Sequence, residues 1–96
     1  MGAVGWIAPC GNFMLGKLYE LYDLAVNKKD LAKAKQLYFK MLPMFSLFET
    51  GVYIQLSKYG MNALGMDYGA PRRPLLPPSL DACKAMDGMM KDLGLL

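Results

Sequence analysis

Residues 3–8 constrain the fold of this chain more than any other segment. Ala3 to Ala8 is a run of small and apolar residues at consecutive positions, bounded by Gly2 on one side and by Pro9-Cys10-Gly11-Asn12 on the other. Because polar and apolar residues do not alternate, the run predicts a strand buried on both faces, as in parallel sheets. Such a strand needs neighbours, yet no other segment has a convincing strand pattern. We therefore expect the chain to begin partway through a larger fold.

A strand without a partner in its own chain must bond its backbone N–H and C=O groups to water or to another chain. We expect residues Met1 to Asn12 to be disordered, recruited into the first helix, or paired with a second copy. As an isolated chain, the protein is predicted to be all-α, with about four helices after one orphan strand.

The rest of the sequence has a helical pattern. Apolar residues recur at spacings of three and four in four segments, with charged residues between them. The predicted apolar faces are Leu15, Leu18, Tyr22 and Ala25 in a helix over 13–26; Ala34, Leu37, Tyr38, Met41, Phe45 and Phe48 in the second helix; Val52, Leu56, Tyr59 and Ala63 in the third; and Ala82, Cys83, Met86, Met90 and Leu93 in the last.

Local signals predict where these helices begin and end. Asp30 and Ser79 can cap the second and fourth helices, because their side chains can accept from free backbone N–H groups of the first turn. Gly51 opens the third helix and Gly65 is placed to end it. Pro43 removes a backbone donor inside the second helix and should kink or split it, with a kink favoured because the apolar phase continues past it. Asp67 to Pro78 holds four prolines and is predicted to be an extended connector.

The composition predicts apolar surface beyond what one small core can hide. Apolar residues make up 54% of the chain and the mean hydropathy is +0.18, so part of that surface is expected to meet another chain or a further domain. The net charge of +3 is too small and too dispersed for a nucleic-acid partner. The N-terminus has no basic segment and its short apolar run is broken by Pro9 and Gly11, so neither a signal peptide nor a membrane partner is expected.

The residue types exclude several classes of chemistry. The chain has no histidine, which removes Ser-His and Cys-His nucleophile arrangements and the usual general base. Its two cysteines form no zinc spacing and no disulfide framework, so we expect no metal, no cofactor and reduced thiols in a cytoplasmic protein. Cys10 could be a reactive thiol at the rim of a site or a small packing residue, and packing is favoured. Cys83, the methionines and the tyrosines are also interpreted as packing residues.

Three segments together resemble one family of enzymes. Gly2-Ala3-Val4-Gly5-Trp6-Ile7-Ala8, followed by Asn12, resembles the eighth barrel strand and its loop in the dihydrodipicolinate synthase and N-acetylneuraminate lyase family of class I pyruvate-type aldolases. Asp30-Leu31-Ala32-Lys33-Ala34-Lys35 leading to Leu42-Pro43 is similar to the family's first C-terminal helix. Lys58, Ala63-Leu64-Gly65, Arg72, Pro74-Leu75-Leu76-Pro77 and Leu93-Gly94-Leu95-Leu96 follow in the order and approximate spacing of its C-terminus.

The resemblance implies a (β/α)8 barrel followed by a helical region, of which this chain would hold only the end. Residues 1–27 would be the last barrel strand and helix, and residues 28–96 the C-terminal helical domain. In the family, a lysine on an earlier strand forms a Schiff base with pyruvate or another 2-oxo acid, and a tyrosine on an earlier strand relays protons. The resemblance therefore implies no catalytic residue in this chain.

The resemblance carries one site position over to this sequence. Ile7 matches the residue of the eighth strand whose backbone carbonyl faces the substrate. Trp6, Pro9 and Cys10 depart from the run seen in typical dihydrodipicolinate synthases, which puts the identity of the 2-oxo acid in doubt.

Two functions stay open from the sequence. The first is a C-terminal part of a lyase that is non-catalytic by itself and serves packing or homo-oligomerisation, as is common in the family. The alternative is a stand-alone helical interaction or oligomerisation module with no enzymatic role. In either case we expect self-association through the face of Leu15, Leu18 and Tyr22, because that face would rest on barrel strands in a complete lyase.

Overall fold

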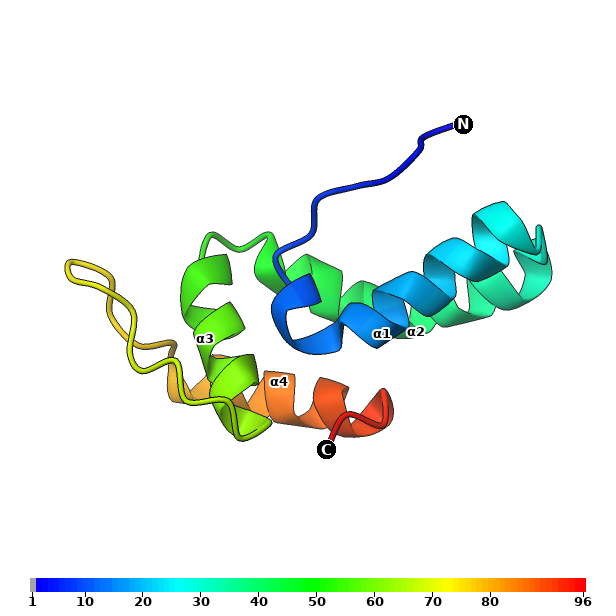
Figure 1. Cartoon of the computed structure of the whole chain (residues 1–96). Coiled ribbons are helices and arrows are strands. Elements are labelled where there is room, and N and C mark those ends of the chain that lie inside the picture. The colour runs from blue at the N-terminus through cyan, green and yellow to red at the C-terminus, as the bar shows by residue number, and fades with distance from the viewer. Residues whose placement is uncertain (1) are drawn as a thin grey trace.

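A computed structural model describes residues 2–96 of the chain as a helical protein. The elements are α1 (Gly11–Tyr22), a π-helical turn η1 (Asp23–Asn27) that continues α1, α2 (Leu31–Phe48), α3 (Tyr53–Ala63) and α4 (Leu80–Asp92). Helices α1 and α2 run side by side as a hairpin that extends away from α3 and α4 (Figure 1). The prediction of an all-α chain with four helices is confirmed.

The predicted strand over residues 3–8 is wrong for the isolated chain. Residues 2–7 are exposed and form no regular structure, and residues 2–96 contain no strand at all. The physical reason is the missing neighbour, since a strand without a paired edge has no ladder of hydrogen bonds to hold it. The carbonyl of Val4 accepts a hydrogen bond of 3.2 Å from the Tyr22 hydroxyl, which ties the segment loosely to α1.

Of the three outcomes expected for residues 1–12, recruitment into the first helix holds for Gly11 and Asn12. Helix α1 starts at Gly11, two residues earlier than its apolar pattern indicated, and Cys10 is its N-cap residue. The part of that prediction that concerns Met1 lies outside the described residues.

The predicted helix caps are confirmed. An Asp30 carboxylate oxygen accepts from the Lys33 backbone N–H at 3.2 Å, and the Ser79 hydroxyl accepts from the Ala82 N–H at 3.2 Å. Beyond α3, Gly65 has a φ of +86° and the N–H of Met66 donates back to the carbonyl of Met61 at 2.9 Å. This is the Schellman arrangement that ends a helix on a left-handed glycine.

Helix α2 runs through Pro43 as one helix from Leu31 to Phe48. Of the two outcomes expected for this proline, a split is therefore excluded, in agreement with the favoured continuous helix. One predicted boundary differs from the structure. Helix α3 begins at Tyr53 rather than at Gly51, because Gly51 has a φ of +89° and belongs to the turn between α2 and α3.

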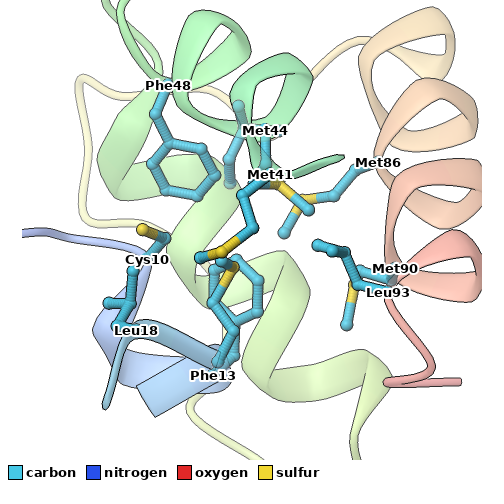
Figure 2. Packing of buried hydrophobic residues seen from close by; sticks show 11 residues of the cluster. Cys10, Phe13, Leu18, Met41, Met44, Phe48, Met86, Met90 and Leu93 are labelled. Carbon is cyan, nitrogen blue, oxygen red and sulfur yellow. The ribbon is translucent and has the colours of Figure 1, made fainter. Parts of the chain in front are cut away.

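The core is formed where all four helices meet, and it is rich in sulfur. Side chains of α1, α2 and α4 converge on one cluster (Figure 2). Met14, Met41, Met44, Leu56, Met86 and Met90 are the largest side chains that are fully buried there. The interpretation of Met41, Met86 and Met90 as packing residues is therefore confirmed, and unbranched methionines suit a junction of four helices because they fill irregular space.

The predicted apolar face of the first helix is wrong in part. Leu18 is buried, but Leu15 is 69% exposed, and Phe13 and Met14 occupy the core instead. The cause is a break in the helical period at Met14, whose φ of −133° and ψ of 36° are not helical. That break changes which side chains point toward the other helices.

Candidate functional site

A continuous apolar surface lies where the N-terminal segment crosses the α1–α2 hairpin. It contains two neighbouring grooves of about 930 and 550 Å³, and Trp6, Leu21 and Tyr38 line both of them. Because the grooves share these side chains, we treat them as one surface and name it the apolar face. Such a surface is typical of a binding site for another protein or for an apolar ligand.

Helix α2 supplies the longest side of the apolar face. Six of the groove-lining residues of this helix and its C-cap recur at spacings of four and three, as in the contact stripe of a coiled coil: Leu31, Lys35, Tyr38, Leu42, Phe45 and Glu49. The buried stripe of the same helix is Ala34, Met41, Met44 and Phe48, and it adjoins the first stripe, because Ala34 and Phe48 also line the grooves. Helix α2 is therefore apolar on two adjoining faces, and the core covers the second one only in part.

Two apolar side chains of this stripe and one beside it are open to solvent, whereas Leu42 and Phe45 are half-buried. Leu31 is 68% exposed, Tyr38 is 41% exposed, and the adjacent Phe39 is 59% exposed. The Tyr38 ring packs on the rings of Phe39 and Phe45, with centroids 5.8 and 6.1 Å away. The aromatic cluster presents a preformed surface, because these rings already contact one another.

The apolar face carries very little charge. Lys35 in the larger groove and Glu49 in the smaller one are its only charged side chains. The ion pairs within residues 2–96 join other groups, namely Lys17 with Glu20, Lys28 with Asp23 and Lys33 with Asp30. Lys35 and Glu49 are thus available to a partner.

Ile7, the substrate contact implied by the family resemblance, lies at the edge of the apolar face. Its side chain is fully exposed and lines the smaller groove together with Trp6 and Pro9. The predicted contact of its backbone carbonyl with substrate stays a prediction.

Cys10 is a packing residue in this structure. Its side chain is buried in the core beneath the smaller groove, and burial raises the pKa of the Cys10 thiol above its usual range. A reactive cysteine requires a shift in the opposite direction. The thiol of Cys83 is partly buried, and its pKa is also raised, again chiefly by burial.

A polar pair that the sequence pattern did not reveal connects α3 to α4. The hydroxyl of Tyr59 donates to a carboxylate oxygen of Asp87 at 2.8 Å. Burial of the phenol, together with this hydrogen bond, raises the pKa of Tyr59 to about 12. The two residues are far apart in sequence, and no local signal indicates their contact.

The lysines and the possible metal ligands of residues 2–96 lie as follows. No lysine is buried, and Lys58, the family-like helix lysine, donates from its ammonium group to the carbonyl of Tyr68 at 3.0 Å. A Schiff-base lysine instead needs a desolvated pocket that favours its neutral form. Within residues 2–96 no cluster of histidine, cysteine or carboxylate side chains is suited to hold a metal ion. None of the helices in this part of the chain is long and apolar enough to span a bilayer.

Comparison with known proteins gives a consistent set of relatives. The chain is 30% identical over 96 residues to the 4-hydroxy-tetrahydrodipicolinate synthase of Methanococcoides burtonii. This alignment covers all of this chain and 33% of the synthase. It is 31% identical to the synthase of the same name from Synechococcus elongatus, over 99% of this chain and 31% of the relative. The synthase of Mycobacterium leprae is 28% identical over 81 residues, 84% of this chain. No protein-family profile matches the sequence. The chain spans about a third of the length of the curated relatives it matches.

Proposed function

We propose that this chain, which is similar over its whole length to synthases of the dihydrodipicolinate synthase family, is the C-terminal, non-catalytic packing and oligomerisation portion of a lyase. The complete lyase would act on pyruvate or another 2-oxo acid through a Schiff base on a lysine outside this chain. The backbone carbonyl of Ile7 would contact that substrate. The two reduced thiols agree with a cytoplasmic location for the lyase.

The observation that carries this proposal is a contrast between the lysines and the apolar face. Every lysine lies at least partly in solvent, whereas a Schiff-base lysine needs a desolvated pocket. The apolar face, by comparison, exposes large side chains such as Trp6 and Tyr38 that gain free energy when covered. These observations favour a packing role for the chain and oppose a Schiff base on one of its lysines.

Borohydride trapping tests the catalytic half of the proposal. The 96-residue chain is incubated with pyruvate and sodium borohydride, and its intact mass is measured. We expect no stoichiometric adduct, whereas a full-length synthase such as that of Methanococcoides burtonii, treated in parallel, should gain the mass of reduced pyruvate. A stoichiometric adduct on any lysine of this chain would overturn the assignment.

A stand-alone helical module is the second candidate, and the closed core favours it. All four helices contribute to one core, and no buried side-chain nitrogen or oxygen within residues 2–96 lacks a hydrogen-bond partner. An intact-mass measurement of the natural product separates the two candidates. A mass near 10.7 kDa supports the module, and a mass about three times larger supports the lyase.

A further inference from the structure

The connector between α3 and α4, residues 67–78, projects away from the four-helix core and is drawn in yellow in Figure 1. Six consecutive residues of the connector are all exposed, and we name them the connector tip: Arg72, Arg73, Pro74, Leu75, Leu76 and Pro77. The tip lies outside both grooves of the apolar face. Neither the apolar face nor the core therefore accounts for its composition.

Hydrogen bonds fix both ends of the connector and leave its tip exposed. On the α3 side, the ammonium group of Lys58 donates to the carbonyl of Tyr68 at 3.0 Å. The side-chain amide of Asn62 donates to the carbonyl of Gly69 at 3.1 Å. On the α4 side, Ser79 caps the helix. A partner would thus meet a segment whose two ends are already ordered, which reduces the entropy lost on binding.

The second half of the tip leads into an extended backbone of the polyproline II type. The rings of Pro77 and Pro78 hold φ at about −65°, and each proline shifts the residue before it into the extended region. Ser79, which follows them, has a φ of −61° and a ψ of 156°, close to the polyproline II values of about −75° and +145°. Within residues 2–96, no backbone–backbone hydrogen bond involves Leu76 or Pro77. The backbone of this stretch is therefore available to a partner, as in other polyproline II ligands.

The tip also carries two positive charges that are not paired within the described chain. Arg72 and Arg73 are exposed, and none of the ion pairs within residues 2–96 includes either of them. The carboxylate that precedes them in the connector, that of Asp67, instead accepts from the Gly69 N–H at 3.3 Å. An arginine guanidinium stacks on aromatic rings and binds a carboxylate through two parallel hydrogen bonds. A partner that suits these side chains is therefore both aromatic and acidic.

A rigid spacer is the simplest alternative role for the connector, and it would need only the prolines. It would not need two adjacent arginines without a partner, or the Leu76 side chain, which is 75% exposed beside Pro77. A nucleic acid is also a poor match, because the tip supplies two cations for phosphates and no aromatic side chain to stack on bases. The composition of the tip favours recognition by a protein.

We propose that the connector tip is a docking motif for a protein domain that binds polyproline II segments in a groove lined by aromatic side chains and edged by carboxylates. Domains of this kind dock proline-rich segments against aromatic rings. Leu76 and Pro77 occupy the aromatic part of the groove, and the two arginines reach the carboxylates at its edge. This interaction goes beyond the proposed packing role and uses no residue of the apolar face.

Biolayer interferometry with the immobilised chain and a panel of purified SH3, WW and EVH1 domains tests the proposal. We expect at least one domain of the panel to bind saturably. Leu76→Ala/Pro77→Ala should weaken that binding by about fivefold or more, because it removes the pair that contacts the aromatic rings. Arg72→Glu/Arg73→Glu should weaken it by about tenfold or more, because it places like charges together at the edge of the groove.

Pro9→Ala/Leu15→Ala and Lys84→Glu/Lys91→Glu are the matched controls. They make the same kinds of substitution at exposed positions outside the connector. Each control should bind within about twofold of the wild type, as is usual for surface substitutions away from a contact. All variants should keep the helical circular dichroism of the wild type.

Three outcomes would overturn the proposal. The first is that no domain of the panel binds, and the second is a complex that either connector variant leaves unchanged. The third is that Lys84→Glu/Lys91→Glu weakens binding as much as Arg72→Glu/Arg73→Glu does, because the domain would then recognise net charge rather than the tip. None of these outcomes affects the borohydride result, so the docking motif and the proposed function are tested separately.

Discussion

Gly60 lies at the closest approach between α3 and two other helices. A Cβ added there would meet Met86 Cε at 2.7 Å and two ring carbons of Phe13 at 2.9 Å. We expect Gly60→Ala to lower the free energy of unfolding by about 1 to 3 kcal/mol, because the Phe13 ring must move within a close-packed core. Urea denaturation followed by circular dichroism measures this. Gly88→Ala is the matched control, because Gly88 lies in α4 with open space around it. This substitution should raise the free energy of unfolding by up to about 1 kcal/mol. Equal effects of the two substitutions would contradict the assigned contact.

Burial of the Tyr59 phenol and its hydrogen bond to Asp87 make stability depend on pH in the alkaline range. The pKa of Tyr59 is raised to about 12 in the folded chain, against about 10 for an unfolded tyrosine. The folded state therefore binds the phenol proton more tightly than the unfolded state does. The resulting contribution of Tyr59 to the free energy of unfolding is fully present below pH 10 and is lost as the pH rises toward 12. We expect the wild type to lose more thermal stability across this range than Tyr59→Phe. Tyr19→Phe, at an exposed tyrosine, should behave like the wild type, and an identical alkaline profile for Tyr59→Phe would be incompatible with the shift.

At the scale of the helices, the caps are the features whose energetic effect is easiest to isolate. The Ser79 hydroxyl accepts from the first turn of α4, so Ser79→Ala should cost about 0.5 to 2 kcal/mol of stability. Ser46→Ala is the same substitution at an exposed position inside α2, where alanine is the better helix former, and it should be neutral or slightly stabilising. Thermal unfolding at low protein concentration compares the two. A Ser79 variant as stable as the Ser46 variant would show that the cap contributes nothing.

Features that depend on neighbouring residues were predictable from the sequence. Asp30, Ser79 and Gly65 perform the predicted tasks at helix ends, since capping is decided within one turn of the chain. The strand over residues 3–8 could not be predicted correctly for this chain, because a strand exists only with partners elsewhere in space. The exposed position of Leu15 was also missed, since nothing in the sequence signals the non-helical backbone at Met14.

The sequence predicted that an exposed apolar surface exists, but it did not predict which residues form that surface. The high apolar content indicated surface that needs a partner, and the apolar face agrees with that expectation. Of the expected face of Leu15, Leu18 and Tyr22, only Tyr22 lines the larger groove, since Leu18 is buried and Leu15 is exposed outside both grooves. Self-association through that face stays a prediction. Tyr38 was predicted to lie on the core stripe of α2 but is exposed on the apolar face, whereas Phe45 both lines a groove and packs against the core. The packing of α2 against the other helices decides which of its side chains are covered.

At the scale of the whole molecule, residues 1–27 and 28–96 share one core, and their division into two domains stays a prediction. Cys10, Phe13, Met14 and Leu18 come from the first part and pack on side chains from the second. Each large apolar side chain that is removed costs roughly 1.5 to 3 kcal/mol of burial free energy. The sum over these residues is comparable to the total stability of a small domain. A chain truncated to residues 28–96 should therefore unfold without a cooperative transition.

The matched truncation is a methionine followed by residues 9–96, which removes the N-terminal segment and keeps the core. We expect it to unfold cooperatively within about 1 kcal/mol of the wild type, because residues 2–7 are exposed and, of the removed residues that the structure describes, only Ala8 packs against the core. Thermal melts of both truncations decide the point. A cooperative transition in the 28–96 chain would establish that the C-terminal helices form an independent unit.

Trp6 gives this protein an intrinsic optical reporter. It is the only tryptophan in the sequence, it is half exposed, and it borders both grooves of the apolar face. An indole in water emits at longer wavelength than an indole in an apolar environment, so whatever covers the apolar face should move the emission toward the blue and protect it from iodide quenching. A fluorescence titration of the unlabelled wild-type chain, by simple dilution, therefore reads the occupancy of this one surface, while the core that holds the four helices together contributes no tryptophan signal.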